Sequence, residues 1–364
     1  MKTESDHVYL VVMAGGSGTR FWPKSLQKKP KQLLSFTPDQ ESLIQKTFKR
    51  FDPLVKKDHR LVVTTELLQD AMKSALNDPS IQILAEPEGR NTAPCVFWAA
   101  QAIKKRDPQA VMIVVPADHW IEDEVSFIKS MSKAVDYANE HPVLMTLGIK
   151  PTRAETGYGY LKINATGLDE EKSDSESTDE SPKKVEQFIE KPNQNKAEEY
   201  FVSKNYLWNG GMFIWKVDVL LKAFESHLPN YLKVWEESDG DVDEAYPKLE
   251  AISIDYGIME RAKQVYTLAL DCGWDDLGNW ISVESLYKKL GYQNEAGVVL
   301  GGDVIAIESH QNIVDIPNRK VALIGIEDCI IVDNGKSILI AKKSKNQDIK
   351  TIVAQLKKDH PDLI

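Results

Sequence analysis

The sequence predicts an α/β protein in which a mixed, mainly parallel sheet is covered by helices and followed by a small β-rich domain. Between residues 8 and 150, apolar runs of strand length alternate with segments of helical periodicity, which is typical of a parallel sheet covered on both faces. After residue 297, short apolar runs recur about every ten residues between Gly, Asn, Asp or Pro, as in small all-β units. We therefore expect a Rossmann-like first unit and a β-helix-like second unit.

The first unit contains five apolar runs with the composition of buried strands. They cover 8–13, 61–64, 81–84, 111–115 and 143–147, and helical patterns cover 43–51, 66–76 and 92–105. From Gly157 the pattern changes to antiparallel-looking strands, including 185–189. Residues 208–215 indicate a turn entering a buried strand, helical patterns cover 217–224 and 254–262, and a short helix ends at Leu290.

The domain boundary is expected near residue 290. Residues 1–290 would form the larger unit, and 291–364 the β-rich unit, which ends in a helix with Ile349, Ile352, Val353 and Leu356 on one face. The acidic tract 169–184 has almost no apolar residue and cannot offset its ordering entropy by burial. We expect it to be a mobile, solvated insertion.

Composition excludes several classes of function. A net charge of −10 argues against nucleic acid as a partner, although a nucleotide needs only a local basic site. The three cysteines, Cys95, Cys272 and Cys329, are widely spaced and suit buried thiols in a reducing compartment. No secretory signal or apolar stretch of membrane-spanning length is present, so we expect a cytoplasmic protein without a membrane partner.

A glycine-rich loop follows the first expected strand and reads A-G-G-S-G-T-R from Ala14 to Arg20. Glycines allow positive φ and close backbone approach, so that successive N–H groups can converge on phosphate oxygens. Arg20 adds a fork of donors for the same anion. The dinucleotide fingerprint and the P-loop are both excluded, because Arg20 and Phe21 stand where those motifs require other residues. A ligand-free tight turn is the alternative interpretation.

The longer signature, G-G-x-G-T-R-x-W-P-x-S followed by Pro30-Lys31-Gln32-Leu33, resembles that of the sugar-nucleotide pyrophosphorylases. Within them it is most similar to the mannose-1-phosphate guanylyltransferases. The resemblance implies a nucleotide-diphospho-sugar transferase fold and the transfer of GMP from GTP to α-D-mannose 1-phosphate, giving GDP-mannose and pyrophosphate. One departure is Lys24-Ser25-Leu26, where the family usually has Leu-Ser-Arg. Lys24 would either replace that arginine at the phosphate or leave the contact unmade.

The resemblance also implies the nucleotide site. Arg20 and Lys31 would meet phosphate oxygens, and with Lys191 they form the expected catalytic set. The loop 86–94 would bind guanine, with Glu86 accepting from its N–H groups and Asn91 or backbone N–H groups serving O6. Asn91 or Thr92 could instead cap the following helix. The full nucleotide set is Ala14, Gly15, Gly16, Gly18, Thr19, Arg20, Lys31, Glu86, Arg90, Asn91, Ala93 and Asp118.

Two aspartates are implied as ligands of a Mg²⁺ cofactor. Mg²⁺ is usually held by one or two carboxylates and the substrate phosphates. Asp118 and Asp276 match the family's metal-binding positions. A helix N-cap or a turn residue is the alternative role for Asp118, and the neighbouring Asp275 is a rival for Asp276.

The sugar phosphate would lie between Gly159, Glu190, Lys191 and Asn209, with Lys191 pairing with the phosphate and Glu190 with hydroxyls. A Glu-Lys pair at a strand end can also be an ordinary surface pair. Two functional alternatives stay open: the same chemistry on another sugar or base, and a non-catalytic regulatory homologue. The C-terminal unit carries no catalytic constellation and could mediate a homodimer, as in the family it resembles.

Overall fold

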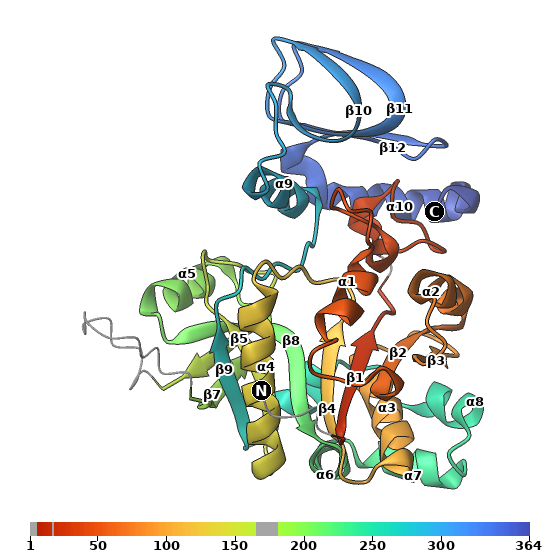
Figure 1. The fold of residues 1–364 in the computed structure, drawn as a ribbon, viewed down its shortest axis with the longest axis vertical. Coiled ribbons are helices and arrows are strands. Elements are labelled where there is room, and N and C mark those ends of the chain that lie inside the picture. Colours follow the sequence, from red (N-terminus) through yellow and green to blue (C-terminus); the bar gives the residue numbers. More distant parts are fainter. Residues whose placement is uncertain (1–5, 17, 165–180) are drawn as a thin grey trace.

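A computed structural model describes residues 6–16, 18–164 and 181–364 (Figure 1). In this part of the chain, a nine-stranded sheet has the order β3-β2-β1-β4-β8-β5-β9-β7-β6, and a four-stranded sheet has the order β10-β11-β12-β13. The smaller sheet lies at one end of the molecule, beyond α9 and α10.

One half of the large sheet is parallel, as the sequence predicts. It consists of β1 (Val8–Met13), β2 (Arg60–Thr65), β3 (Gln82–Glu86) and β4 (Val111–Pro116). Successive side chains of a strand face opposite sides, so Tyr9 and Val11 enter one core while Leu10 and Val12 enter the other. The first face is covered by α3 (Thr92–Arg106), α6 (Val217–His227) and α7 (Pro229–Glu237), and the second by α1 (Leu43–Arg50) and α4 (Glu124–Glu140).

The expectation of a mainly parallel sheet is wrong for the other half. β8 (Tyr206–Lys216) lies between β4 and β5 (Leu144–Ile149) and is antiparallel to both. β9 (Val265–Leu270), which the sequence did not reveal, is parallel to β5, and the antiparallel pair β6 (Tyr160–Ile163) and β7 (Lys183–Ile189) completes the sheet. The residues 208–215, expected to begin as a turn, lie wholly within β8. Strand partners are chosen by long-range packing, which a local apolar pattern does not encode.

Several shorter elements also differ from expectation. The pattern at 254–262 contains a π-helical turn, Asp255–Met259, and α5 (Gln194–Ser203) and α8 (Val242–Ala245) are helices that the sequence did not reveal. The helix predicted over 66–76 is confirmed as α2 (Gln69–Leu76), which follows a short 3₁₀ turn. Of the acidic tract, residues 169–180 lie outside the described part. Its last two residues, Lys183 and Lys184, begin β7 and pair with β9, so the insertion ends earlier than expected.

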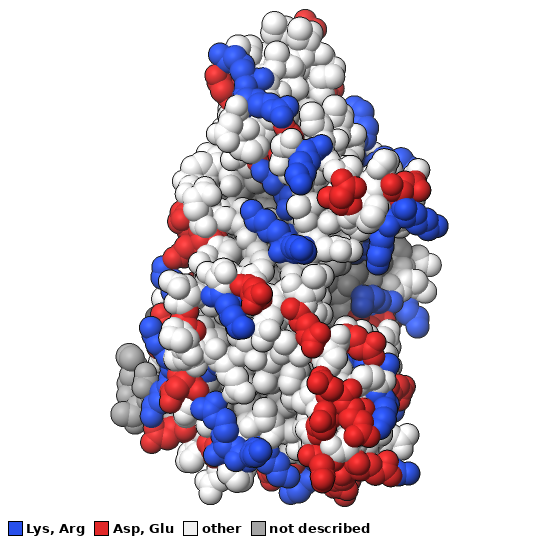
Figure 2. All heavy atoms as spheres, turned by 90° about the vertical axis from the view of Figure 1, so that its right-hand side faces the viewer, with Lys and Arg blue, Asp and Glu red and all other residues white. Residues whose placement is uncertain are grey.

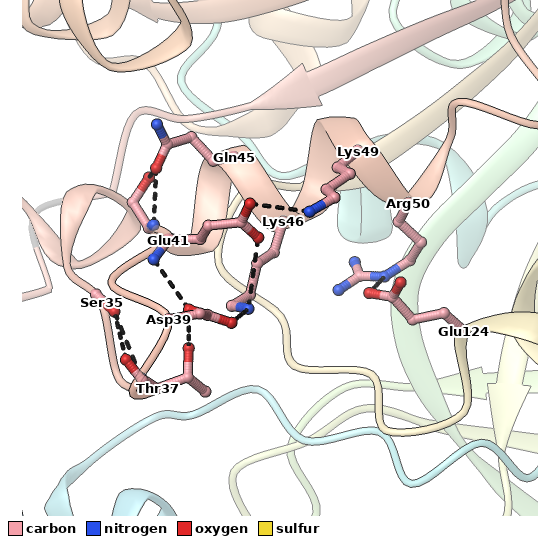
Figure 3. Close-up of polar contacts among 10 residues, drawn as sticks. Ser35, Thr37, Asp39, Glu41, Gln45, Lys46, Lys49, Arg50 and Glu124 are labelled. Carbon is pink, nitrogen blue, oxygen red and sulfur yellow. Dashed lines mark hydrogen bonds and ion pairs between the residues drawn. The ribbon is translucent and has the colours of Figure 1, made fainter.

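The segment before α1 is held by a polar network (Figure 3). The Asp39 carboxylate accepts from the Thr37 hydroxyl at 2.8 Å and from the Glu41 backbone N–H at 2.9 Å, and it pairs with Lys46 at 2.5 Å. Ser42 and Gln45 then form the capping box that begins the helix. This network fixes the chain shortly after Lys31.

The small sheet is made of β10 (Gly297–Ile307), β11 (Asn312–Ile324), β12 (Cys329–Asp333) and β13 (Ile338–Lys342). The first three are parallel, and β13 is antiparallel to β12. Some predicted short strands are joined: the runs at 298 and 304–307 form one irregular strand, as do most of those at 313–316 and 321–326. The helix α9 (Trp280–Lys289) links the two units, and α10 (Ile349–Asp359) is the predicted terminal helix.

No helix in the described ranges is long and apolar enough to cross a membrane. The three cysteines are buried free thiols, as expected.

Candidate active site

The candidate site lies at the carboxyl end of the parallel strands, where ligands of such sheets usually bind. The glycine loop follows β1, the Glu86 loop follows β3, and Asp118 follows β4. A pocket of about 310 Å³ opens there and is lined by Gly18, Thr19, Arg20, Phe21, Lys31, Asp118, His119, Asp276 and Gly278. A larger pocket of about 460 Å³ lies elsewhere, between α2 and β3, and contains none of the predicted residues.

Lys31 is the link between the acidic residues of this pocket. Its side chain is only 6 % exposed, and Nζ donates to Asp118 Oδ2 at 2.9 Å and to the backbone oxygen of Asp276. Burial is the largest single influence on the pKa of Asp118 and raises it, but the charges of Lys31 and His119 and the hydrogen bonds to the carboxylate together lower that pKa below its usual value. Gly18 has φ 59°, and a Cβ there would collide with the Lys31 side chain. The glycine is therefore required both for its backbone conformation and for the position of Lys31.

Asp276 and Asp275 have separate tasks. Asp276 Oδ1 accepts from the Tyr158 hydroxyl at 2.9 Å and from the Gly278 N–H at 3.0 Å. Asp275 Oδ1 instead accepts from the Leu277 N–H at 2.6 Å, which holds the turn, and Asp275 does not line the pocket. This division favours Asp276 over its neighbour as the metal ligand.

The donor set suits Mg²⁺ bound together with a nucleotide. No group of three or more His, Cys, Asp or Glu side chains that could form a protein cage occurs among the described residues. Asp118 and Asp276 both line the pocket, and two carboxylates completed by phosphate oxygens are the usual environment of this ion. The cation beside Asp118 is Lys31, which comes from a different segment of the chain.

The Glu86 loop lies against the glycine loop. Glu86 is 4 % exposed, and an added Cβ on Gly15 would lie 3.3 Å from its Oε2. Burial raises the pKa of Glu86 to about 7, although a hydrogen bond donated by the Tyr246 hydroxyl to Oε1 acts in the opposite direction. Tyr246 is 160 residues away in sequence and was missed, because nothing local marks it as a partner.

The other predicted residues of this loop make structural contacts. The Asn91 side chain accepts from the Thr92 N–H at 2.9 Å, so the helix-cap interpretation is confirmed. Arg90 pairs with Glu88 at 2.5 Å and donates to the Leu249 backbone oxygen at 2.6 Å. Ala93 is buried, and its N–H donates to the backbone oxygen of Ile252. Roles of Arg90, Asn91 and Ala93 at the nucleotide stay predictions.

The four residues expected at the sugar phosphate are neighbours. The Asn209 N–H donates to the Gly159 backbone oxygen at 2.8 Å, and Lys191 Nζ pairs with Glu190 Oε1. An added Cβ on Gly159 would lie 2.5 Å from Glu190 Oε2, so only glycine leaves room for that carboxylate. The Asn209 amide is held by Thr146, whose hydroxyl donates to Oδ1 at 3.0 Å.

Asp255 is a further member of this group that the sequence analysis missed. Asn209 Nδ2 donates to its Oδ1 at 2.9 Å. Burial, together with the nearby charge of Glu190, raises the pKa of Asp255 to about 6. It begins the π-helical turn, a rare element often found at functional sites. An acidic residue inside an apolar helical pattern was the available signal.

Comparison with known proteins identifies the family of the chain. A family model described as "Nucleotidyl transferase" matches residues 9–293, and one described as "MannoseP isomerase/GMP-like beta-helix domain" matches residues 302–356. A mannose-1-phosphate guanylyltransferase of Escherichia coli K12 is 35 % identical over 372 residues, which cover 97 % of this chain and 74 % of that protein. The alginate biosynthesis protein AlgA of Pseudomonas aeruginosa is 34 % identical over 364 residues, covering 95 % and 71 %. A solved structure from Thermus thermophilus, described as a mannose-1-phosphate geranyltransferase, has a TM-score of 0.83 at 30 % identity and covers 96 % of this chain and 99 % of that one.

The chain belongs to the nucleotidyl transferase family, with a C-terminal β-helix domain. Within that family it is a mannose-1-phosphate guanylyltransferase-like nucleotidyl transferase.

Proposed function

We propose that the chain transfers GMP from GTP to α-D-mannose 1-phosphate, releasing pyrophosphate and GDP-mannose. The observation that carries this proposal is the pocket itself, in which Arg20, Lys31, Asp118 and Asp276 meet beside a glycine loop. The test is turnover of the purified chain with each of four nucleoside triphosphates and a panel of sugar 1-phosphates, followed by pyrophosphate release. If the chain prefers another nucleoside triphosphate or another sugar 1-phosphate, it catalyses the same nucleotidyl transfer on a different substrate. Binding without turnover would identify a regulatory homologue.

Both reactants are anions, so the main tasks of the site are to neutralise charge and align the reacting groups. Backbone N–H groups of the glycine loop, with Arg20 and Lys31, would bind the triphosphate. Lys191 would hold the sugar phosphate, which is already ionised at neutral pH and needs no general base. Mg²⁺ held by Asp118 and Asp276 would supply electrostatic stabilisation of the phosphates.

We further propose the division and setting of the enzyme. Residues 1–290 would be the catalytic unit and 291–364 the C-terminal domain, with a homodimer in the cytoplasm as the working form. Sedimentation of the purified chain tests the dimer.

The first prediction concerns base selection. If the Glu86 carboxylate accepts from guanine, Glu86→Gln is expected to reduce the preference for GTP over ATP by about 1–3 kcal/mol, or ~5- to 150-fold, the usual cost of an unsatisfied buried group. Competition assays with both nucleotides measure the ratio. An unchanged ratio would mean that backbone groups read the base.

The Tyr246→Phe variant refines this test. The hydroxyl of Tyr246 lowers the pKa of Glu86. Removing that hydroxyl therefore raises the pKa of Glu86 further above its usual range and leaves a smaller fraction of Glu86 ionised at pH 7. The KM for GTP should therefore rise at pH 7 and recover at higher pH. Tyr231→Phe is a matched control, because Tyr231 is a buried tyrosine that donates to the backbone oxygen of Glu250 instead.

The second prediction concerns Asp255, which we propose accepts a hydrogen bond from a sugar hydroxyl together with Glu190. Asp255→Asn is expected to raise the KM for mannose 1-phosphate about tenfold at pH 7.5, the effect of one hydrogen bond to a charged group. In the parent protein the KM should rise as pH falls through about 6, because protonation removes the acceptor. The substrate phosphate also titrates near pH 6. The Asp255→Asn variant is therefore the control, because the pH dependence of its KM reports the titration of the phosphate without that of Asp255.

The stability of the folded protein should depend on pH in the opposite sense to substrate binding, and should be greater at low pH. An acid whose pKa is raised in the folded state binds more protons when folded, so stability is lost as pH rises from about 4 through 6. Asp255→Asn removes this loss and should increase the melting temperature at pH 7. A lower melting temperature with unchanged KM would identify Asp255 as purely structural.

A further inference from the structure

The loop 20–24, which follows the glycines of the signature motif, is bonded to the C-terminal domain along most of its length. Four contacts come from four different segments of that domain. Arg20 Nε donates to Gln347 Oε1 at 3.0 Å, Trp22 Nε1 to the Leu363 backbone oxygen at 2.9 Å, Asn334 Nδ2 to the Pro23 backbone oxygen at 2.7 Å, and Lys24 Nζ pairs with Asp315 Oδ1 at 2.9 Å. All four residues on the loop side of these contacts belong to the part of the signature motif that follows the glycines: Arg20, Trp22, Pro23 and Lys24.

The same loop shares a hydrophobic core with that domain. Phe21 and Trp22 belong to one buried cluster with Ile313, Ile330 and Ile349. Figure 1 shows α10 lying between the small sheet and the N-terminal loops. Moving the loop would therefore expose apolar surface of both units.

Lys24 explains the departure from the family signature. Its side chain is 23 % exposed and that of Asp315 is 13 % exposed, so the ion pair is largely enclosed between the units. Burial raises the pKa of Asp315, although the charge of Lys24 opposes this. The ammonium of Lys24 is thus engaged with the C-terminal domain and does not line the pocket.

Of the four loop residues that contact the C-terminal domain, Arg20 also lines the pocket. The contacts with that domain can therefore affect the pocket through the position of Arg20. Its Nε is held by Gln347, and Nη1 lies 3.4 Å from the Gly278 backbone oxygen. A guanidinium is planar, so two contacts on different nitrogens fix its plane and leave further N–H donors for an anion.

The surrounding charge also comes from this domain. Partial burial and the nearby charge of Arg20 lower the pKa of Lys350, the residue after the start of α10. Figure 2 shows one face of the molecule, on which Lys and Arg side chains lie over both halves and a dense group of Asp and Glu side chains lies far from the C-terminal domain.

We propose that the C-terminal domain is a working part of the nucleotide site, with Gln347 as the positioning residue that orients Arg20 toward the triphosphate. The identity of the anion rests on the proposed function, whereas the coupling between the domains does not. The C-terminal domain thereby contributes to the binding of the nucleotide.

The test is a double-mutant cycle on Gln347 and Arg20. Gln347→Leu is expected to weaken GTP binding, measured by calorimetry without the second substrate, about tenfold, or ~1.4 kcal/mol, with the KM for mannose 1-phosphate and the melting temperature unchanged. In an Arg20→Ala background the same change should have no further effect, because the contact acts only through Arg20. Lys345→Ala, at an exposed position of the same turn, is the control and should bind GTP as the parent does.

A second pair of variants tests the loop anchor independently. Asp315→Asn leaves Lys24 without its partner and should weaken GTP binding, although Asp315 does not line the pocket. Lys24→Met combined with Asp315→Leu should restore it, because an apolar pair can replace an enclosed ion pair. Additive losses in the Gln347 cycle, or GTP affinity unchanged by Gln347→Leu and by Asp315→Asn, would overturn the proposal. A parent chain that binds no nucleotide would instead refute the proposed function.

Discussion

Replacing Lys31 with methionine is expected to lower kcat/KM by about 10³-fold, the scale found when one preorganised charge-stabilising donor is removed. Lys31 is buried in the pocket and donates to Asp118 and to the Asp276 backbone. Its loss removes a positive charge from the triphosphate site and leaves the Asp118 carboxylate without its cation. Methionine preserves most of the side-chain volume, so the fold should persist.

Steady-state kinetics with both substrates and a thermal unfolding curve measure this effect. Lys28→Met is the matched control, because Lys28 is an exposed lysine three residues earlier. Near-parental kcat/KM in Lys31→Met would show that Arg20 and the backbone suffice to bind the phosphates.

The second large effect is expected at the metal. Asp118→Asn and Asp276→Asn should each lower kcat by ~10²- to 10⁴-fold, because each would remove a ligand of the ion that offsets the charge of the phosphates. The double variant should be little worse than either single one, since the two ligands act as a unit. Asp275→Asn should be milder, because the Asp275 carboxylate holds the turn through the Leu277 N–H.

Chelation provides the complementary measurement. Activity should vanish with a chelator and return with Mg²⁺, and Mg²⁺ with GTP should raise the melting temperature of the parent chain but not that of Asp118→Asn. Full turnover in chelator, or a larger loss in Asp275→Asn than in Asp276→Asn, contradicts the assignment.

The sequence was sufficient where a function depends on a contiguous segment. The continuous apolar run 8–13 predicts a strand buried on both faces, and β1 does bury its alternate residues in two cores. The glycine loop and the Pro-Lys-Gln segment were recognisable because their residues follow one another and a tight phosphate-binding turn imposes strict local requirements. The division that we propose between residues 1–290 and 291–364 rests on the same kind of evidence, a change in local pattern.

Only the tertiary structure decided which distant residues meet. β8 lies between β4 and β5 and is antiparallel to both, because long-range packing selects strand partners. Tyr246 reaches Glu86, and Asp255 joins Asn209, across 160 and 46 residues. Gln347 reaches Arg20 across 327 residues. Each of these contacts joins a distant residue to one that the sequence had already identified. Such contacts depend on burial and proximity, which exist only once the chain has folded.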